Sequence, residues 1–164
     1  MEDPAAMQPL PERIKKVWRL TSVLATGIIL VIGEVIIWTT HFLVSFASTL
    51  TTALGIIYFF LLILIGIFDL ILVAYRYQFH RYQVTETDLA IQKGYFFRKL
   101  TFVPMNRIQH IEMEQGPFLR QQQLISLVIH TAATAHKIEG IAEVDAQALR
   151  KQILLLVKAA KADV

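Results

Sequence analysis

The sequence predicts an α+β membrane protein, with a two-helix transmembrane hairpin followed by a β-sandwich or open barrel that a C-terminal α-helix caps. Hydrophobic residues make up 55% of the 164 residues and the mean hydropathy is +0.51, whereas soluble domains are roughly 45 to 50% apolar. The excess is concentrated between Leu20 and Tyr75, where there is no Lys or Arg and the only acidic residues are Glu34 and Asp69. The remainder reads as short β-type segments and one amphipathic helix.

The apolar stretch is long enough for two membrane spans of about 20 residues each, but not for three. We place the spans at about 18–40 and 52–74. Residues 1–17 then form a cytoplasmic N-terminal segment, 18–75 the hairpin and 76–164 a soluble domain. A signal peptide is the competing interpretation, because basic residues precede the first run. We reject it because that run exceeds the usual apolar region of about 7 to 15 residues and a second run follows at once.

The charge distribution predicts how the hairpin is oriented. Trp18 and Trp38 are 20 residues apart, which is about 30 Å of helix and would place one indole at each membrane interface. The linking segment 39–52 carries no charge apart from the titratable His41. Basic residues flank both outer ends of the hairpin: Arg13, Lys15, Lys16 and Arg19 before it, and Arg76 and Arg81 after it. The positive-inside rule therefore places both termini in the cytoplasm.

Two ionisable residues lie inside the spans, where charge is costly and often functional. Asp69 lies near the expected interface, where it can snorkel or pair with Arg76. Glu34 lies deeper, and Gly27, seven residues earlier on the same helix face, favours close helix contact. Glu34 is either a protonated or hydrogen-bonded carboxyl packed against another helix, or a solvated site. We interpret Glu34 and Gly27 as candidate contacts to another membrane subunit.

The soluble domain begins where the pattern changes to short segments rich in β-branched and aromatic residues. Turn residues separate these segments at Thr85 to Asp88, Gly94, Pro104 to Asn106 and Gly116-Pro117. Residues Phe118 to Leu124 read as one short helical turn. The predicted strands are Phe79 to Val84, Leu89 to Lys93, Tyr95 to Val103, Arg107 to Glu114, Leu127 to Ala132 and Lys137 to Ile141.

The final segment has the periodicity of an amphipathic helix. Leu149, Ile153, Leu156 and Ala160 recur at intervals of 4, 3 and 4 residues, which draws an apolar stripe along one face. Asp145 is the predicted N-cap of this helix. One helix after a run of antiparallel strands is expected to cap an open barrel or sandwich.

Composition excludes several classes of function. Residues 76–164 carry 12 Lys or Arg against 8 Asp or Glu, and these basic residues are scattered, so no nucleic-acid-binding stripe is indicated. The chain has no cysteine, which removes thiolate nucleophiles and Cys-type zinc sites. His110, His130 and His136 lack the spacing of a helical metal motif, and Ser126 lacks a nucleophile elbow. We therefore expect no enzymatic activity, no catalytic residues, no cofactor and no metal.

Several runs of the soluble domain resemble those of the bacterial pleckstrin-homology-like (PH-like) domain family. The most specific are Val103-Pro104-x-x-Arg107-Ile108-Gln109 and Gln115-Gly116-Pro117-x-x-Arg120. With the hairpin ahead of them, they are similar to the small, membrane-anchored YdbS-like members. The resemblance spans Trp18 to about Leu156. The family usually has a glycine near Gln123, and a proline before the glycine where this chain has Glu139-Gly140.

The resemblance implies a bent seven-stranded sandwich closed by a C-terminal helix, at the membrane of a bacterial cell. It also implies that small members act beside a larger membrane protein bearing several homologous PH-like domains. The leading hypothesis is therefore a non-enzymatic interaction module for such a partner. The alternatives are a sensor of anionic lipid headgroups and an accessory subunit of a transporter with Glu34 in its pathway. Candidate partner or headgroup contacts are Arg76, Arg81, Lys93, Arg98, Lys99, Arg107 and Gln109. For Arg107, Gln109 and Gln115 we favour internal hydrogen bonding to a loop.

Overall fold

The computed structural model describes residues 7–43, 48–94 and 98–162. The chain divides into two compact units. One unit is the segment Trp18–Ala74, and the other joins the residues up to Val17 with those from Tyr75 onward. We describe the hairpin unit first and then the soluble unit.

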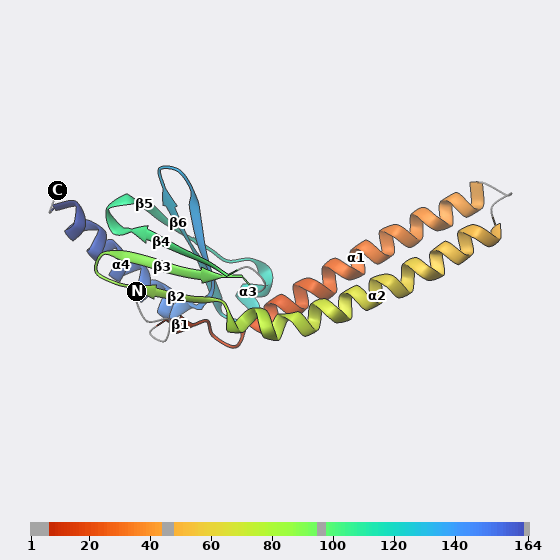
Figure 1. Ribbon diagram of the computed structural model, residues 1–164, viewed down its shortest axis with the longest axis horizontal. Helices are drawn as coiled ribbons and strands as arrows, with labels where there is room; N and C mark the ends of the chain where they lie inside the picture. The colour runs from red at the N-terminus through yellow and green to blue at the C-terminus, as the bar shows by residue number, and fades with distance from the viewer. Residues whose placement is uncertain (1–6, 44–47, 95–97, 163–164) are drawn as a thin grey trace. The chain divides into compact units, whose positions relative to one another are not determined.

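The hairpin unit is formed by two long helices that lie side by side, α1 (Ile14–Leu43) and α2 (Ser48–Gln78) (Figure 1). Both predicted spans fall within these helices. Large apolar side chains point away from the helix pair, with Phe60 65% and Phe68 58% exposed. A water-soluble protein rarely exposes such continuous apolar surface, whereas a helix whose backbone is satisfied internally can present it to lipid. The helices are long and apolar enough to cross a membrane.

The soluble unit contains two antiparallel sheets with seven strands in its described part. The four-stranded sheet has the order β1-β2-β3-β4 and the three-stranded sheet the order β5-β6-β7. A short helix, α3 (Pro117–Gln121), connects β5 to β6. The strands are β1 (Gln8–Pro9), β2 (Arg81–Val84), β3 (Asp88–Lys93), β4 (Lys99–Pro104), β5 (Ile108–Glu114), β6 (Leu124–Thr131) and β7 (Ala135–Ala142).

The core lies on the inner faces of the two sheets. On the four-stranded sheet, Leu89 pairs with Val103 across β3 and β4, and both are buried. On the three-stranded sheet, the central strand β6 is buried from Leu124 to Ile129. Strand β6 begins three residues before its predicted start at Leu127, because the helical turn ends at Gln121 and not at Leu124. Residues 95–97 of the predicted strand Tyr95 to Val103 lie outside the described residues, and β4 begins at Lys99.

The C-terminal helix α4 (Glu143–Ala162) packs on the strands as expected of a cap, but its buried face differs slightly from the predicted one (Figure 1). Ala146, Ile153 and Val157 are its buried residues. Of the predicted stripe, Ile153 is fully buried, and Leu149, Leu156 and Ala160 are only half-buried at its sides. The predicted N-cap is wrong, because the helix begins at Glu143 and Asp145 lies within its first turn. There the carboxylate still interacts favourably with the helix dipole.

Residues 7–17 pack into the soluble unit, whereas the sequence predicts a separate N-terminal segment over 1–17. Strand β1 pairs with β2, and Met7, Leu10, Ile14 and Val17 are all buried. Tyr77 donates a hydrogen bond to the Leu10 carbonyl oxygen. The unit is therefore closed by residues from both sides of the hairpin in the sequence.

Two backbone positions in the left-handed region shape the turns of this unit. Gly140 has φ +68°, and a Cβ there would overlap the side chain of Ile14. Gln123 has φ 54°. Left-handed backbone is strained for a residue with a Cβ, so the conformation of Gln123, between α3 and β6, lowers the stability of the fold.

Candidate functional site

Small residues set how closely α1 and α2 approach each other. A Cβ on Gly33 would overlap the Tyr58 ring, and one on Gly66 would lie 3.0 Å from Thr26 Cγ2. Tyr58 Oη donates a hydrogen bond of 2.6 Å to the Ile29 carbonyl oxygen. Since lipid provides little hydrophobic drive between helices, close packing at small residues and hydrogen bonds between helices hold such a pair together.

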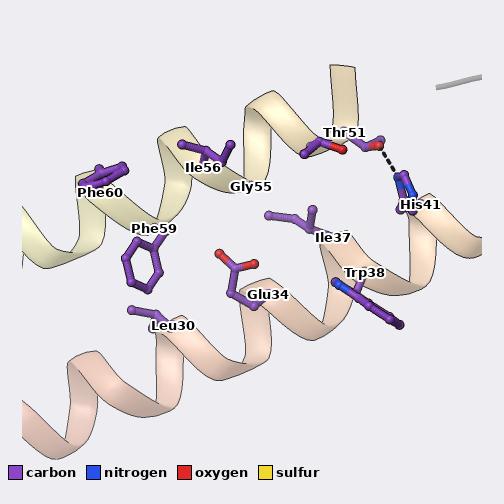
Figure 2. A pocket seen from close by; sticks show the side chains of 11 residues that line it. Leu30, Glu34, Ile37, Trp38, His41, Thr51, Gly55, Ile56, Phe59 and Phe60 are labelled. Atoms are coloured by element: carbon purple, nitrogen blue, oxygen red, sulfur yellow. Dashed lines mark hydrogen bonds between the residues drawn. The ribbon is translucent and has the colours of Figure 1, made fainter. Parts of the chain in front are cut away.

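Glu34 points from α1 toward α2 and lines a cavity of about 550 Å³ between the two helices (Figure 2). Leu30, Ile37 and Phe59 contribute apolar walls. A Cβ on Gly55 would lie 3.8 Å from Glu34 Oε2, so the glycine leaves room opposite the carboxyl group. Glu34 Oε1 is buried and has no hydrogen-bond partner among the described residues. Such a group is costly in an apolar environment unless a donor or a proton satisfies it.

The cavity is more polar towards the end of α1 at Leu43 and the start of α2 at Ser48. There His41 Nδ1 and Thr51 Oγ1 are 2.9 Å apart and share a hydrogen bond across the two helices (Figure 2). Trp38 lines the same cavity and is 75% exposed, as suits an indole at a membrane interface. Trp18, the other predicted interfacial residue, is buried at 8% exposure.

Gly27, which the sequence predicts to lie at a close helix contact, is not closely packed against α2. A Cβ on Gly27 would meet no atom within 4 Å, so the face around it is open to lipid or to another helix. The role of Glu34 and Gly27 in binding a membrane subunit stays a prediction. Asp69 is exposed on α2 and makes no ion pair with a described residue.

The basic residues predicted to contact a partner or a headgroup gather partly around the β3–β4 pair. Lys93 and Lys99 are direct partners in the strand register. Burial lowers the pKa of Lys93; the negative charge of Glu139 opposes this, and the positive charges of Lys137, Arg76 and Lys99 lower the pKa further. Like charges placed opposite each other on paired strands are destabilising. An anion bound near them would relieve that cost.

The remaining predicted basic contacts lie near the end of α2. Arg98 Cζ lies 4.9 Å from the centroid of the Phe79 ring, in a cation–π arrangement. Arg81 Nε donates a 3.4 Å hydrogen bond to the Gln78 carbonyl oxygen. These contacts orient the two guanidinium groups, and each guanidinium carries further N–H donors beyond them.

Strand β4 forms one edge of the four-stranded sheet and has no strand on its outer side in the described part of the chain. Leu100 and Phe102 are 47% and 50% exposed on this strand. Residues two apart on a strand share a face, so these two apolar side chains form one patch beside unpaired backbone groups. Exposed hydrophobic edges of this kind invite pairing with another strand. We call Leu100, Phe102 and the outer backbone of β4 the β4 edge.

Three polar residues of the family-like motifs have separate surroundings. Gln115 Nε2 donates a 3.0 Å hydrogen bond to the Leu124 carbonyl oxygen and so joins the end of β5 to the start of β6. This is the internal role expected for Gln115. Arg107 and Gln109 are exposed, which leaves them accessible to a partner.

Sequence reasoning missed one cluster of side chains. His110 and His130 are direct partners on β5 and β6, and their rings stack with centroids 4.2 Å apart. Glu112 lies within 3.3 Å of a ring nitrogen of each histidine. The sequence spacing of 20 residues gave no signal, because only the strand register brings the two histidines together.

Comparison with known proteins agrees with this architecture. The family model described as "Bacterial PH domain" matches residues 9–157. The transmembrane protein YdbS of Bacillus subtilis (strain 168) is 31% identical over 149 residues, which is 91% of this chain and 91% of that protein. No solved structure is a significant match. With a sandwich of two antiparallel sheets, a C-terminal helix and two apolar helices, the chain belongs to the bacterial PH domain family and is a membrane-associated, YdbS-like member of it.

Proposed function

We propose that the protein is a non-enzymatic interaction module, anchored in the membrane with both termini in the cytoplasm. It assembles as a small subunit with a larger membrane protein that carries homologous PH-like domains. The observation that carries this proposal is the β4 edge, whose outer side has no strand in the described part of the chain and on which Leu100 and Phe102 are 47% and 50% exposed.

The β4 edge offers both affinity and specificity to a partner that supplies a strand. Main-chain hydrogen bonds extend the sheet, and side-chain pockets select the sequence of the added strand. Leu100 and Phe102 provide the apolar anchors, and Lys99 at the start of β4 adds a charge that selects an acidic neighbour. A homologous domain is a suitable partner, because its own sheet has edge strands with backbone groups free to pair.

Anchoring in the membrane makes a weak contact effective. Two proteins confined to one membrane meet at a higher effective concentration than two soluble ones, without any new contact. The hairpin also adds a second contact surface, since Glu34 Oε1 has no hydrogen-bond partner among the described residues. A donor on a helix of the partner would satisfy Glu34 within the membrane.

The test is purification of the full chain in a mild detergent, with the co-purifying protein identified by mass spectrometry. The wild-type chain is expected to retain a membrane protein with PH-like domains in a fixed ratio, and F102D is expected to lose it. L155D is the matched control, because Leu155 is an exposed apolar residue on α4, at 67% exposure. A chain that purifies alone under every extraction condition would refute the proposal. Equal retention by F102D and the wild type would refute the β4 edge as the contact.

The second candidate function is binding of anionic lipid headgroups, which the direct pairing of Lys93 with Lys99 favours. Basic residues near an anionic surface contribute about 1 kcal/mol each. The full chain in nanodiscs of neutral or anionic lipid separates the two candidates. If headgroups bind here, anionic lipid should raise the stability of the soluble unit in a salt-dependent way. K99Q should reduce that gain by about 1 kcal/mol, while K151Q, a change on α4, should leave it intact. No effect of anionic lipid would exclude the headgroup function.

A further inference from the structure

The cluster of His110, Glu112 and His130 is built by the register of β5 and β6. His110 and His130 occupy directly paired positions, and paired residues of neighbouring strands point to the same face. Glu112 lies two residues beyond His110 and therefore shares that face. The two rings stack with centroids 4.2 Å apart and planes inclined by only 9°. The fold thus places two imidazoles and one carboxylate together at the outer surface of the sheet.

The potential ligand atoms of these residues converge. His110 Nε2 is 3.3 Å from Glu112 Oε1, and His130 Nε2 is 3.3 Å from Glu112 Oε2. One ligand atom from each of the three residues lies within 4.8 Å of the other two. His130 Nε2 is buried, and its approach to the carboxylate does not satisfy hydrogen-bond geometry, so this nitrogen lacks a hydrogen-bond partner in the described chain. A buried ring nitrogen without a hydrogen bond requires another partner.

We propose that His110, Glu112 and His130 bind one divalent transition-metal ion, of which Zn²⁺ is the best match. Zn²⁺ is bound by His nitrogen at about 2.0–2.1 Å and by carboxylate oxygen at about 2.0–2.2 Å. Two donors on one tetrahedral ion are then about 3.4 Å apart, and each imidazole nitrogen is 3.3 Å from one oxygen of the carboxylate, His110 from Oε1 and His130 from Oε2. The His110 and Glu112 side chains are 56% and 53% exposed, so they have room to rotate out of the stacked arrangement, and metal binding requires that rotation because one ion cannot lie in both of two nearly parallel ring planes with centroids 4.2 Å apart.

The donor set also decides which ions bind. Imidazole nitrogen suits zinc, copper, nickel and iron, whereas Mg²⁺ and Ca²⁺ require oxygen ligands. Three protein ligands leave the fourth position of a tetrahedral ion open. Because the cluster lies at the surface, that position takes a water molecule or a ligand from another molecule.

The test is titration of Zn²⁺ into the full, tag-free chain in detergent micelles by isothermal calorimetry. Co²⁺ serves as a second probe, read by its visible absorption. One Zn²⁺ per chain is expected. H110Q, H130Q and E112Q should each weaken binding at least about tenfold, since even the outer-shell partners of metal ligands change affinity about 10- to 100-fold. Circular dichroism of each variant shows whether it still folds, and the three independent variants keep the test valid if one does not.

His136 provides the matched control. It lies on β7 of the same sheet, but it pairs with Ile129 and therefore faces the opposite side from His130. H136Q should bind Zn²⁺ like the wild type. Absence of saturable Zn²⁺ binding, or binding that survives both H110Q and H130Q, would overturn the proposal. Equal loss of binding in H136Q would do so as well. None of these readouts depends on a protein partner or on lipid, so the test of the metal site is independent of the test of the proposed function.

Discussion

The contact between Ile14 and Gly140 gives the sharpest test of how the N-terminal segment completes the soluble unit. Ile14 is 1% exposed, and a Cβ on Gly140 would lie 2.7 Å from Ile14 Cγ1 and closer still to Cδ1. In G140A, the left-handed backbone costs about 1–2 kcal/mol and overpacking against Ile14 about 1–3 kcal/mol. G140A is therefore expected to lower the free energy of unfolding by about 2–5 kcal/mol.

The double variant makes the prediction specific to this contact. I14A alone should cost about 2–5 kcal/mol, as buried Ile-to-Ala changes do. I14A removes the two atoms that overlap most, Cδ1 and Cγ1, and leaves Cβ at 3.2 Å, so adding G140A should then lower the free energy of unfolding by little more than the backbone contribution of about 1–2 kcal/mol. The loss of free energy of unfolding in the double variant should thus be about 1–3 kcal/mol smaller than the sum of the losses in the two single variants.

A buried thiol provides the assay. The chain has no cysteine, and Ser126 is 1% exposed with no hydrogen-bond partner for its hydroxyl among the described residues. S126C is therefore a mild change whose thiol reacts only when the unit opens. Pulsed thiol labelling of the full chain in micelles across a urea series gives the free energy of unfolding, with L155A as an exposed control. Additivity of I14A and G140A within about 0.5 kcal/mol would refute the contact.

Three further predictions concern backbone strain, topology and pH. Q123G should raise the free energy of unfolding by about 0.5–1 kcal/mol in the same assay, because it removes backbone strain at φ 54°. The control Q121G, at the end of α3, should lower the free energy of unfolding by about 1 kcal/mol. A lower free energy of unfolding in Q123G would contradict the prediction. In intact cells a membrane-impermeant thiol reagent should label T49C at the start of α2 and should reach K151C on α4 only after permeabilisation; the reverse would invert the topology. Burial lowers the pKa of His80, so the stability it contributes is fully present above the ordinary pKa of about 6.5 and is lost as pH falls below it. H80Q should flatten the pH dependence of unfolding there, and an unchanged slope would refute the assignment.

The pattern of apolar and polar residues predicts the helices and strands correctly where the apolar run is long or its periodicity is strong. The two long helices α1 and α2 and the strand β3 lie within a few residues of the predicted segments, because uninterrupted apolar runs and clear turn residues bound them. Leu124 was missed as the start of β6, since the helical turn before it has no sharp terminal signal. The N-terminal segment carried an overlooked signal: Met7, Leu10, Ile14 and Val17 recur at intervals of 3, 4 and 3 residues.

The candidate sites were harder to predict, because they depend on which strands become neighbours. No local pattern shows that β4 is an edge strand with Phe102 half exposed, since an interior strand with the same residues would bury that side chain. The His110–His130 pair likewise exists only through the register of β5 with β6. Glu34 is the exception, because an acidic residue in an apolar span is conspicuous in any sequence.

Site-specific photocrosslinking tests the central claim most directly, namely that the protein binds a larger membrane protein through the β4 edge. A photoreactive phenylalanine analogue would replace Phe102 in the full chain, and in a separate control it would replace Leu155 on α4. In intact cells, irradiation should yield an adduct from position 102, and not from 155, with a larger membrane protein that carries PH-like domains. No adduct from position 102, adducts only with a second copy of the chain, or equal adducts from both positions would contradict the account.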